Sequence, residues 1–320
     1  GERSIKRVAG GIKGIWQRKF LGYIWAMTMR TATEAYDLIR PLRQRVPLVF
    51  SSPHSGRAYP AQLLARTALD GRMIRSSEDA WVDELFAGAP RLGAPLLLAN
   101  APRAYIDLNR APDELDPALI EGVTRSPHNP RISSGLGVIP RVVAQGRPIY
   151  RGKIARSEAE DRLARFWQPY HAAMAALMAE TRAGFGEAVL IDCHSMPHEA
   201  LEGQSRPGSP RPDVVLGDRF GAAAARGVVD RIEAAFTAAG LRVARNAPFA
   251  GAYITQAYGR PSRGHHAVQI EIDRALYMDE TRIEKRADFA AFAGVMAEVV
   301  AGIVAAFAPS GSDTGTLAAE

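Results

Sequence analysis

The sequence predicts an α/β protein with a mostly parallel or mixed central sheet and helices on both faces. Three apolar runs, at residues 47–50, 188–191 and 266–273, have the length of buried strands. Segments with helical periodicity lie between them, and strands that alternate with helices favour parallel pairing. Such sheets bind ligands at the carboxyl ends of their strands, so a functional site is expected at this edge.

The first half of the chain predicts one helix and three strands. After the first apolar run, Ser77 is placed to cap a helix that extends through Phe86. Residues 94–99 and 104–108 are short apolar runs and are predicted strands. Residues 111–150 are rich in Pro, Gly and Ser and lack a clear period. A long irregular stretch inside a compact domain is typical of a lid or binding loop.

The second half predicts three helices and three strands. Ser157 begins a capping box, Ser-Glu-Ala-Glu, and the apolar residues after it keep helical spacing to Gly184 or Gly186. A kink is expected at Pro169. The strand at 188–191 follows this helix. The remaining predicted elements are a helix over 219–239, a strand at 241–244, the strand at 266–273 and a last helix over 287–306.

The net positive charge of the chain comes from its first 30 residues. The chain has 320 residues, with 40 Lys and Arg against 34 Asp and Glu, and residues 1–30 hold seven of the basic residues and one acid. The remainder has 33 of each and is formally neutral. We therefore expect no nucleic-acid partner, and any affinity for polyanions would reside in residues 1–30.

Composition divides the chain into three parts. Residues 1–40 are predicted to be a basic extension outside the fold, 41–308 a single α/β hydrolase domain and 309–320 a flexible tail. No apolar stretch in residues 1–30 reaches the length of a signal peptide or membrane span, so no membrane partner is expected. A basic surface anchor in this segment is the alternative. Cys193 is the only cysteine, which excludes an intrachain disulfide and fits a cytoplasmic location.

Two histidines follow apolar strands and predict a metal site. His54 comes shortly after the first apolar run, and His194 comes shortly after the second. The third run contains Glu271, and a carboxylate inside an apolar strand is costly unless a cation or hydrogen bonds compensate it. Two imidazoles, a supporting acid and a carboxylate base suit metal-assisted hydrolysis, in which the metal lowers the pKa of its water to about 7.

Five sequence blocks resemble the motifs of one enzyme family. They are Ser-Pro-His-Ser-Gly from Ser52, Arg-Ala-Tyr-Ile-Asp-Leu-Asn-Arg from Arg103, Asp-Cys-His-Ser from Asp192, Gly-Ala-Tyr-Ile-Thr from Gly251 and His-Ala-Val-Gln-Ile-Glu from His266. In this order they resemble the N-formylglutamate amidohydrolases, also called N-formylglutamate deformylases. The resemblance implies a zinc-carboxypeptidase-like sheet of the phosphorylase/hydrolase type and one divalent metal ion, expected to be zinc. It also implies hydrolysis of N-formyl-L-glutamate to L-glutamate and formate in histidine degradation.

The resemblance implies three metal ligands. His54 and His194 are ligands on both the motif and the strand arguments. Zinc carboxypeptidases commonly take the third ligand three residues after the first histidine, where this chain has Arg57. Asp79 corresponds to an acid in the family and is the expected third ligand, with Glu78 as its rival. The alternative for Asp79 is an acid at a helix N-terminus, which the helix dipole favours.

Two further acids receive roles. By analogy with zinc carboxypeptidases, Glu271 would take the proton from the metal-bound water and pass it to the departing amine. The alternative is a structural carboxylate that pairs with Arg274 or another arginine. Asp192 shares a strand face with His194, so it is expected to hydrogen-bond a ligand imidazole and fix its tautomer.

N-formyl-L-glutamate is a small anionic N-acyl amino acid, so its pocket needs cations. Asn109 and Arg110 resemble the Asn-Arg pair with which zinc carboxypeptidases hold a substrate carboxylate. Arg103 would hold the other carboxylate or polarise the scissile carbonyl. The alternative for either arginine is a structural ion pair with Asp107 or Asp113.

Three more residues match family blocks and are expected to line the pocket: Tyr253, Thr255 and His266. A hydrogen-bonded structural role is the alternative for His266. Some family members have His and Arg where this chain has Tyr253 and Gln256. The change removes a cation, which leaves the acyl group and the amino acid of the substrate open.

Two other classes of function remain. A related metal-dependent hydrolase of another N-acyl amino acid or of a peptide terminus would share these residues and differ in its pocket. A non-catalytic binding protein would have lost a ligand or the base, whereas His54, His194 and Glu271 are all present. The sequence specifies neither the metal used in the cell, because several divalent ions suit such ligands, nor the oligomeric state.

Overall fold

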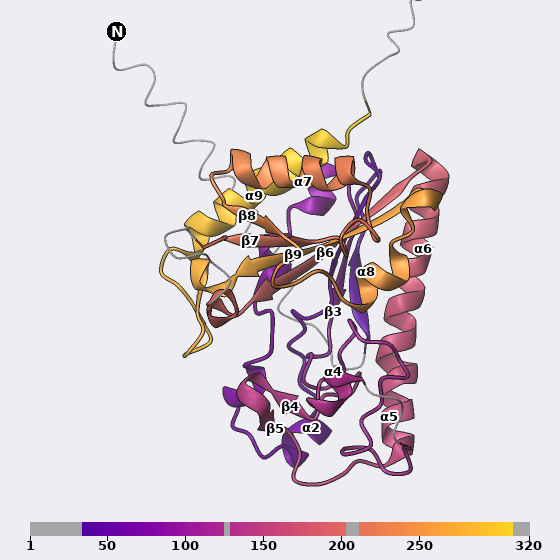
Figure 1. Cartoon of the computed structure of the whole chain (residues 1–320), viewed down its shortest axis with the longest axis vertical. Coiled ribbons are helices and arrows are strands. Elements are labelled where there is room, and N and C mark those ends of the chain that lie inside the picture. The colour runs from indigo at the N-terminus through magenta and orange to yellow at the C-terminus, as the bar shows by residue number, and fades with distance from the viewer. Residues whose placement is uncertain (1–33, 125–128, 203–210, 310–320) are drawn as a thin grey trace, which may run out of the picture.

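The computed structural model describes residues 34–124, 129–202 and 211–309, and its centre is a seven-stranded sheet (Figure 1). In spatial order the strands are β1 (Tyr36–Ile39), β3 (Leu96–Ala99), β2 (Leu48–Ser52), β6 (Ala188–Met196), β9 (His265–Asp273), β7 (Val214–Gly217) and β8 (Val243–Arg245). The four neighbours β3, β2, β6 and β9 are parallel, whereas β1 is antiparallel to β3 and β7 is antiparallel to β9. The predicted α/β class with a mostly parallel or mixed sheet is confirmed.

Helices cover both faces of this sheet (Figure 1). One face packs against α3 (Val82–Leu85), α7 (Arg226–Ala238) and α9 (Phe289–Ala306). The other face packs against α6 (Gln168–Phe185) and α8 (Tyr253–Tyr258). Strands β2, β6 and β9 lie in the middle of the sheet, so both of their faces are buried and their sequences are apolar nearly throughout.

The alternation of side chains along β6 positions its polar residues. Ile191 and Cys193 belong to the core beneath α7 and α9, and Leu190 belongs to the core beneath α6. Because successive side chains point to opposite faces, Asp192 and His194 continue the Leu190 series and lie on the α6 side. The same rule places Gln269, Glu271 and Asp273 of β9 on that side, because they continue the series of Ala267.

The described residues of the irregular stretch predicted at 111–150 form only short elements. Together with the segments around them, they pack beyond the sheet, in the lower part of Figure 1. The remaining elements of the described chain are α2 (Ala61–Arg66), α4 (Pro130–Ser133), β4 (Val142–Val143), β5 (Arg147–Pro148), α5 (Arg156–Arg162), β10 (Met278–Asp279) and β11 (Glu284–Lys285).

By length and composition, α9 is apolar enough to cross a membrane. A helix that packs in a protein core passes the same test. One side of α9 is buried, with Val299, Val300 and Ile303 in the core that it shares with α7. This packing accounts for the apolar residues on the buried side, which make up 28% of the helix.

The predicted boundary of the domain at residue 40 is wrong by a few residues. Residues Tyr36–Ile39 form β1, the edge strand of the sheet, and pair with Leu96–Ala99. The ring of Tyr36 also packs edge-on against Tyr170, with centroids 6.4 Å apart. Four residues between polar segments carry too little periodicity to be recognised as a strand. The predicted characters of residues 1–33 and 310–320 concern positions outside the described residues.

The strand predicted at 104–108 is absent from the described structure. Tyr105 N and Ile106 N both donate to Pro102 O, so this segment forms turns. Its apolar side chains are buried in the core beneath α6. Burial of an irregular segment, not strand pairing, therefore explains its apolar pattern.

Two helix starts also differ from the prediction. The helix expected from Ser77 begins only at Val82, because the preceding Trp81 adopts a left-handed conformation with φ of 61°. The capping box at Ser157 is not formed, because α5 already begins at Arg156, after Ala155. The disturbance expected at Pro169 appears as a π-helical turn over Leu163–Trp167, between α5 and α6.

Loss of β1 is expected to destabilise the domain. A chain that begins at residue 41 leaves one edge of β3 unpaired and loses the Tyr36–Tyr170 contact, in comparison with a chain that begins at residue 34. Its melting temperature should be lower, by about 2 to 4 °C for each kcal/mol lost. Circular dichroism measures the difference. Equal melting temperatures would show that β1 does not contribute to the cooperative fold.

Candidate active site

A cleft of about 880 Å³ lies at the carboxyl ends of β2, β6 and β9. His54 follows β2, His194 lies in β6 and Glu271 lies in β9, and all three line the cleft. Residues between 131 and 146 also line it. The fold therefore brings side chains that are far apart in the sequence to the edge where ligands are expected.

His54, His194 and Asp79 form a tight, buried cluster in this cleft. The two imidazole rings are 4.7 Å apart between centroids. Nδ1 of His194 lies 2.9 Å from Oδ2 of Asp79, and Nδ1 of His54 lies 3.4 Å from the same oxygen. One ligand atom from each residue lies within 4.8 Å of the others, so the group could bind a metal ion.

A carboxylate holds each imidazole from its other side. Oδ1 of Asp107 lies 2.7 Å from Nε2 of His54, and Oδ2 of Asp192 lies 3.0 Å from Nε2 of His194. A carboxylate at this place accepts the Nε2–H and leaves Nδ1 to face Asp79. The contact expected between Asp192 and a ligand imidazole is present.

The charges of the cluster support one another. Burial raises the pKa of Asp79, but the hydrogen bond from His194 and the charges of both imidazoles outweigh it and hold this pKa well below its usual value. Burial lowers the pKa of His194, but Asp192 and Asp79 outweigh it and raise this pKa well above its usual value. A positive charge between these acids is therefore strongly favoured, and a metal ion would supply it in place of a proton.

One buried atom of the cluster has no hydrogen-bond partner among the described residues, namely Nδ1 of His54. An orphaned buried nitrogen is costly and calls for an explanation. Two imidazole nitrogens and a carboxylate oxygen form a donor set that zinc and similar divalent ions accept. The residues present therefore fit a metal ion.

The neighbouring acid Glu78 is directed elsewhere. It accepts hydrogen bonds from Tyr59 and Arg75. Asp79 is the acid that faces the histidines, and its Oδ1 accepts a hydrogen bond of 2.9 Å from Arg274. Asp79 also precedes α3 instead of lying in its first turn. These contacts favour Asp79 over Glu78 as the third ligand and disfavour its reading as a helix-terminal acid.

Arg57 occupies the position of the third carboxypeptidase ligand and points away from the cluster. Its guanidinium donates to Oδ2 of Asp83 over 3.0 Å. Asp83 is fully buried and does not line the cleft. Asp83 is therefore poorly placed to act on a substrate in the cleft.

Glu271 lies beside the cluster on the adjacent strand. It is in direct register with His194 in the β6–β9 pairing, and Gln269 donates to its Oε1 over 2.7 Å. Burial raises the pKa of Glu271 to about 7, with a further increase from Asp79, although His194 and two arginines oppose it. The alternative pairing with Arg274 is not formed, because Arg274 binds Asp79.

Asn109 connects three parts of the site. Its Nδ2 lies 3.1 Å from Nε2 of His194 and donates weakly to Oδ2 of Asp192, at 3.5 Å. Its Oδ1 accepts the backbone N–H of Ile254 over 2.7 Å, at the start of α8. The buried amide is thus engaged within the protein, although it also lines the cleft.

Arg103 and Arg110 both line the cleft. Nε of Arg103 donates to Asp107 over 3.0 Å, which is the pairing named as its alternative. Arg110 donates only to two backbone carbonyls, those of Leu136 and Asn109, among the described residues. Burial and nearby arginines lower the pKa of Arg110 despite the attraction of Asp107. The positive charge of Arg110 therefore favours the binding of an additional anion.

The model of the N-formylglutamate amidohydrolase family matches residues 46–278, which is most of the chain. The chain belongs to this family.

The similarity extends to individual relatives. The N-formylglutamate deformylase of Pseudomonas aeruginosa is 36% identical over 246 residues, which cover 74% of this chain and 84% of that protein. The N-formylglutamate deformylase of Pseudomonas putida is 31% identical, with the same coverage. The crystal structure of N-formylglutamate amidohydrolase from Ralstonia eutropha JMP134 superposes with a TM-score of 0.79 at 36% identity, and the match covers 85% of this chain and 98% of that one.

Three residues that were predicted to line the pocket of this member of the N-formylglutamate amidohydrolase family are not among those that line the cleft. His266 lies at the amino end of β9, five residues before Glu271, or about 16 Å at the usual strand rise. Its Nδ1 accepts the backbone N–H of Ala225, so the structural alternative fits. Thr255 is fully buried, and its hydroxyl donates to Ala252 O. Tyr253 lines a neighbouring cavity instead of the cleft.

Three residues of the site make contacts that the sequence did not predict. Asp107 holds His54, Gln269 holds Glu271 and Arg274 holds Asp79. Gln269 lies two residues before Glu271 in one strand, so the alternation rule could have identified it. Asp107 and Arg274 reach their partners through tertiary contacts, which leave no local sequence signal.

Replacement of Asp107 by Asn is expected to weaken metal binding. The amide keeps the shape of the side chain but removes the charge that orients the His54 imidazole. Zinc affinity should fall by about 10- to 100-fold, as is usual for partners of this kind. Competition with a chelating dye measures the affinity.

The matched control is Asp116→Asn, because Asp116 is also buried and pairs with an arginine, Arg141, but lies outside the cluster. Equal zinc affinities of the two variants would show that Asp107 does not support the site.

Proposed function

We propose that this chain is a metal-dependent amidohydrolase that converts N-formyl-L-glutamate and water to L-glutamate and formate. The family and the two relatives named N-formylglutamate deformylase support this reaction. The observation that carries the mechanism is the convergence of His54, His194 and Asp79, directly beside Glu271.

His54, Asp79 and His194 would hold one divalent ion, with zinc as the proposed metal. When bound, the ion would supply Lewis acidity, which polarises a carbonyl oxygen and lowers the pKa of a coordinated water toward about 7. Asp107 and Asp192 keep the two imidazoles in the tautomer that such binding needs. Arg274 fixes the carboxylate of Asp79 from its other oxygen.

Glu271 would accept a proton from the attacking water and pass it to the departing α-amine. A pKa of about 7 suits a group that must both gain and lose a proton near neutrality. Gln269 engages Oε1, and within the described chain Oε2 forms no hydrogen bond, so one oxygen remains for proton transfer.

Arg103 would stabilise the negative charge that develops on the formyl oxygen. Its Nε is committed to Asp107, but its two terminal amino groups make no hydrogen bond to the described residues. Donors that are already fixed in place are the most effective stabilisers of a developing oxyanion. Arg110, whose guanidinium has only backbone partners among the described residues, would bind a carboxylate of the substrate.

The proposal also covers the partner of the enzyme, its pathway and its location. The proposed partner is a small anionic N-acyl amino acid. A place in histidine degradation is what the resemblance implies for such a substrate. Cys193 is a free, buried cysteine, and burial raises the pKa of its thiol well above the usual value. An unreactive thiol as the only cysteine supports a cytoplasmic enzyme.

Loss of both histidines is expected to abolish metal binding. The double variant His54→Ala, His194→Ala retains only one of the three donors. Elemental analysis after dialysis should find about one divalent ion per wild-type chain and much less than one per variant chain. His265→Ala, which changes a partly exposed histidine at the far end of β9, is the control. Stoichiometric metal in the double variant would refute the proposed metal site.

Replacement of Glu271 by Gln separates the base from the ligands. The amide keeps the shape and loses the proton-accepting carboxylate, so metal should be retained while formate release slows at least about 100-fold. The control is Glu180→Gln, because Glu180 is exposed and, within the described part of the chain, pairs only with Arg40. Loss of metal would make Glu271 a ligand, and near-normal turnover would remove it from the mechanism.

The pH profile gives a second test of Glu271. A base must be deprotonated, so kcat/KM should fall as the pH decreases through its pKa. Burial places this pKa at about 7, and a bound cation would shift it lower. The acid limb should therefore lie at or below about pH 7 and should be lost in Glu271→Gln. Metal content measured at each pH excludes dissociation of the ion as the cause.

A further inference from the structure

Two of the arginines that line the cleft have no carboxylate partner within the described chain. Arg274 pairs with Asp79, and Arg103 pairs with Asp107. Arg110 and Arg131 form no ion pair with any described residue. Paired arginines are neutralised locally, so the two unpaired guanidiniums are the ones that favour an incoming anion.

The backbone holds these two arginines in one unit. Nε of Arg110 donates to Leu136 O over 2.9 Å, and the N–H of Leu136 donates to Arg131 O over 2.8 Å. The side chain of Asn129 accepts the N–H of Arg131 over 3.0 Å and caps the short helix α4. The position of α4 relative to Arg110 is therefore fixed by hydrogen bonds.

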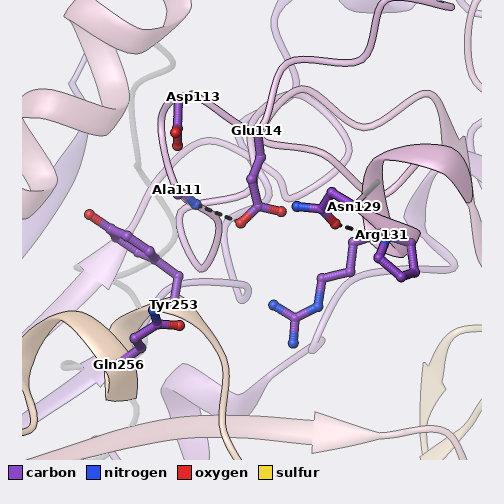
Figure 2. A pocket seen from close by; sticks show the side chains of 8 residues that line it. Ala111, Asp113, Glu114, Asn129, Arg131, Tyr253 and Gln256 are labelled. Carbon is purple, nitrogen blue, oxygen red and sulfur yellow. Dashed lines mark hydrogen bonds between the residues drawn. The ribbon is translucent and has the colours of Figure 1, made fainter. Parts of the chain in front are cut away.

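Arg131 stands where the cleft meets a second cavity of about 500 Å³. Figure 2 shows Arg131 directed into this cavity, with Tyr253 and Gln256 of α8 on its other side and Glu114 between them. Among the described residues that line the cavity, Arg131 is the only cation. A substrate in the cleft can thus extend a negative group toward Arg131.

We propose that Arg131 binds the side-chain carboxylate of the substrate and makes the enzyme select acidic N-acyl amino acids. The inference rests on the proposed function and assigns its selectivity to a residue outside the five motif blocks. In N-formyl-L-glutamate the α-carboxylate is attached to the carbon that carries the scissile amide, whereas two methylene groups separate the side-chain carboxylate from it. The buried Arg110 donates to the carbonyl of Asn109, whose side-chain amide lies 3.1 Å from Nε2 of His194, so Arg110 suits the nearer carboxylate. Arg131, at the outer end of the cleft, suits the farther one.

Two acids, Asp113 and Glu114, line the same cavity and provide the opposing charge. Oε1 of Glu114 accepts the N–H of Ala111, and its Oε2 is buried without a hydrogen-bond partner among the described residues. The distance from Glu114 to Arg131 is too great for an ion pair, yet its charge competes with a substrate carboxylate for the guanidinium. This competition predicts the direction in which substrate binding should change. Removal of the charge of Glu114 should strengthen binding of an acidic side chain and weaken binding of a basic one.

The experiment compares N-formyl-L-glutamate with N-formyl-L-glutamine, which differ in side-chain charge and little in shape. Formate release is measured for the metal-loaded full chain. The wild type should prefer the glutamate substrate, and Arg131→Ala should reduce its kcat/KM by about 10- to 100-fold, chiefly through KM. The glutamine substrate should be affected little, so the discrimination disappears. Arg110→Ala should reduce kcat/KM for both substrates, because they share the α-carboxylate.

Three further variants separate charge from structure. Arg131→Lys keeps the charge without the planar fork and should recover part of the preference. Glu114→Gln should lower KM for the glutamate substrate. Arg226→Ala removes an exposed cation of α7 and should leave both rates unchanged. Arg131 is exposed, and unchanged melting curves would confirm that its variants fold.

Several outcomes would overturn the inference. These are unchanged discrimination in Arg131→Ala, a higher KM for the glutamate substrate in Glu114→Gln, or a wild-type preference for N-formyl-L-lysine. If the wild type releases formate from none of these substrates, the proposed function fails instead. Calorimetric titration of L-glutamate and L-glutamine into the wild type and Arg131→Ala then decides the inference, since binding needs no turnover. Equal affinities of the wild type for the two amino acids would refute it.

Discussion

Four carboxylates are buried in or beside one cleft, and the compensation of their charge is the constraint on which the site depends. Asp79, Asp107, Asp192 and Glu271 are all less than 8% exposed. Each ionised group would be too costly in a protein interior without hydrogen bonds and positive charge. The two imidazoles provide hydrogen bonds and positive charge to Asp79, Asp107 and Asp192. Arg274 adds to this at Asp79, and Arg103 adds to it at Asp107. Glu271 receives the least compensation, and burial raises its pKa to about 7, whereas the pKa values of Asp79 and Asp107 are held well below their usual value.

This shared compensation makes the cluster a single unit. Asp79 contacts both imidazoles and Arg274, so removal of any partner leaves the others with uncompensated charge. Groups connected in this way do not contribute additively to stability or function. The unit also explains why an ion suits its centre. A cation between the imidazoles would satisfy the orphaned nitrogen of His54 and the negative charge of Asp79 with one particle.

The sequence predicted those parts of the site that lie on strands. The apolar runs of β2, β6 and β9 have a clear pattern, and polar residues at their ends stand out against it. The segment at 104–108 has a similar pattern without strand pairing, because burial alone selects apolar residues. The choice between Glu78 and Asp79 depends on which adjacent side chain turns inward, and the local pattern does not contain this information.

The link between His194 and Glu271 differs in kind from the link between Arg110 and Arg131. The first runs through the paired backbones of two central strands, whose spacing a side-chain substitution leaves unchanged. The second runs through a single loop residue, Leu136, and a four-residue helix. Mutations accumulate more readily in such segments than in a sheet. Descendants of this chain could therefore acquire new acyl amino acids as substrates through changes around α4, while the hydrolytic chemistry is inherited intact.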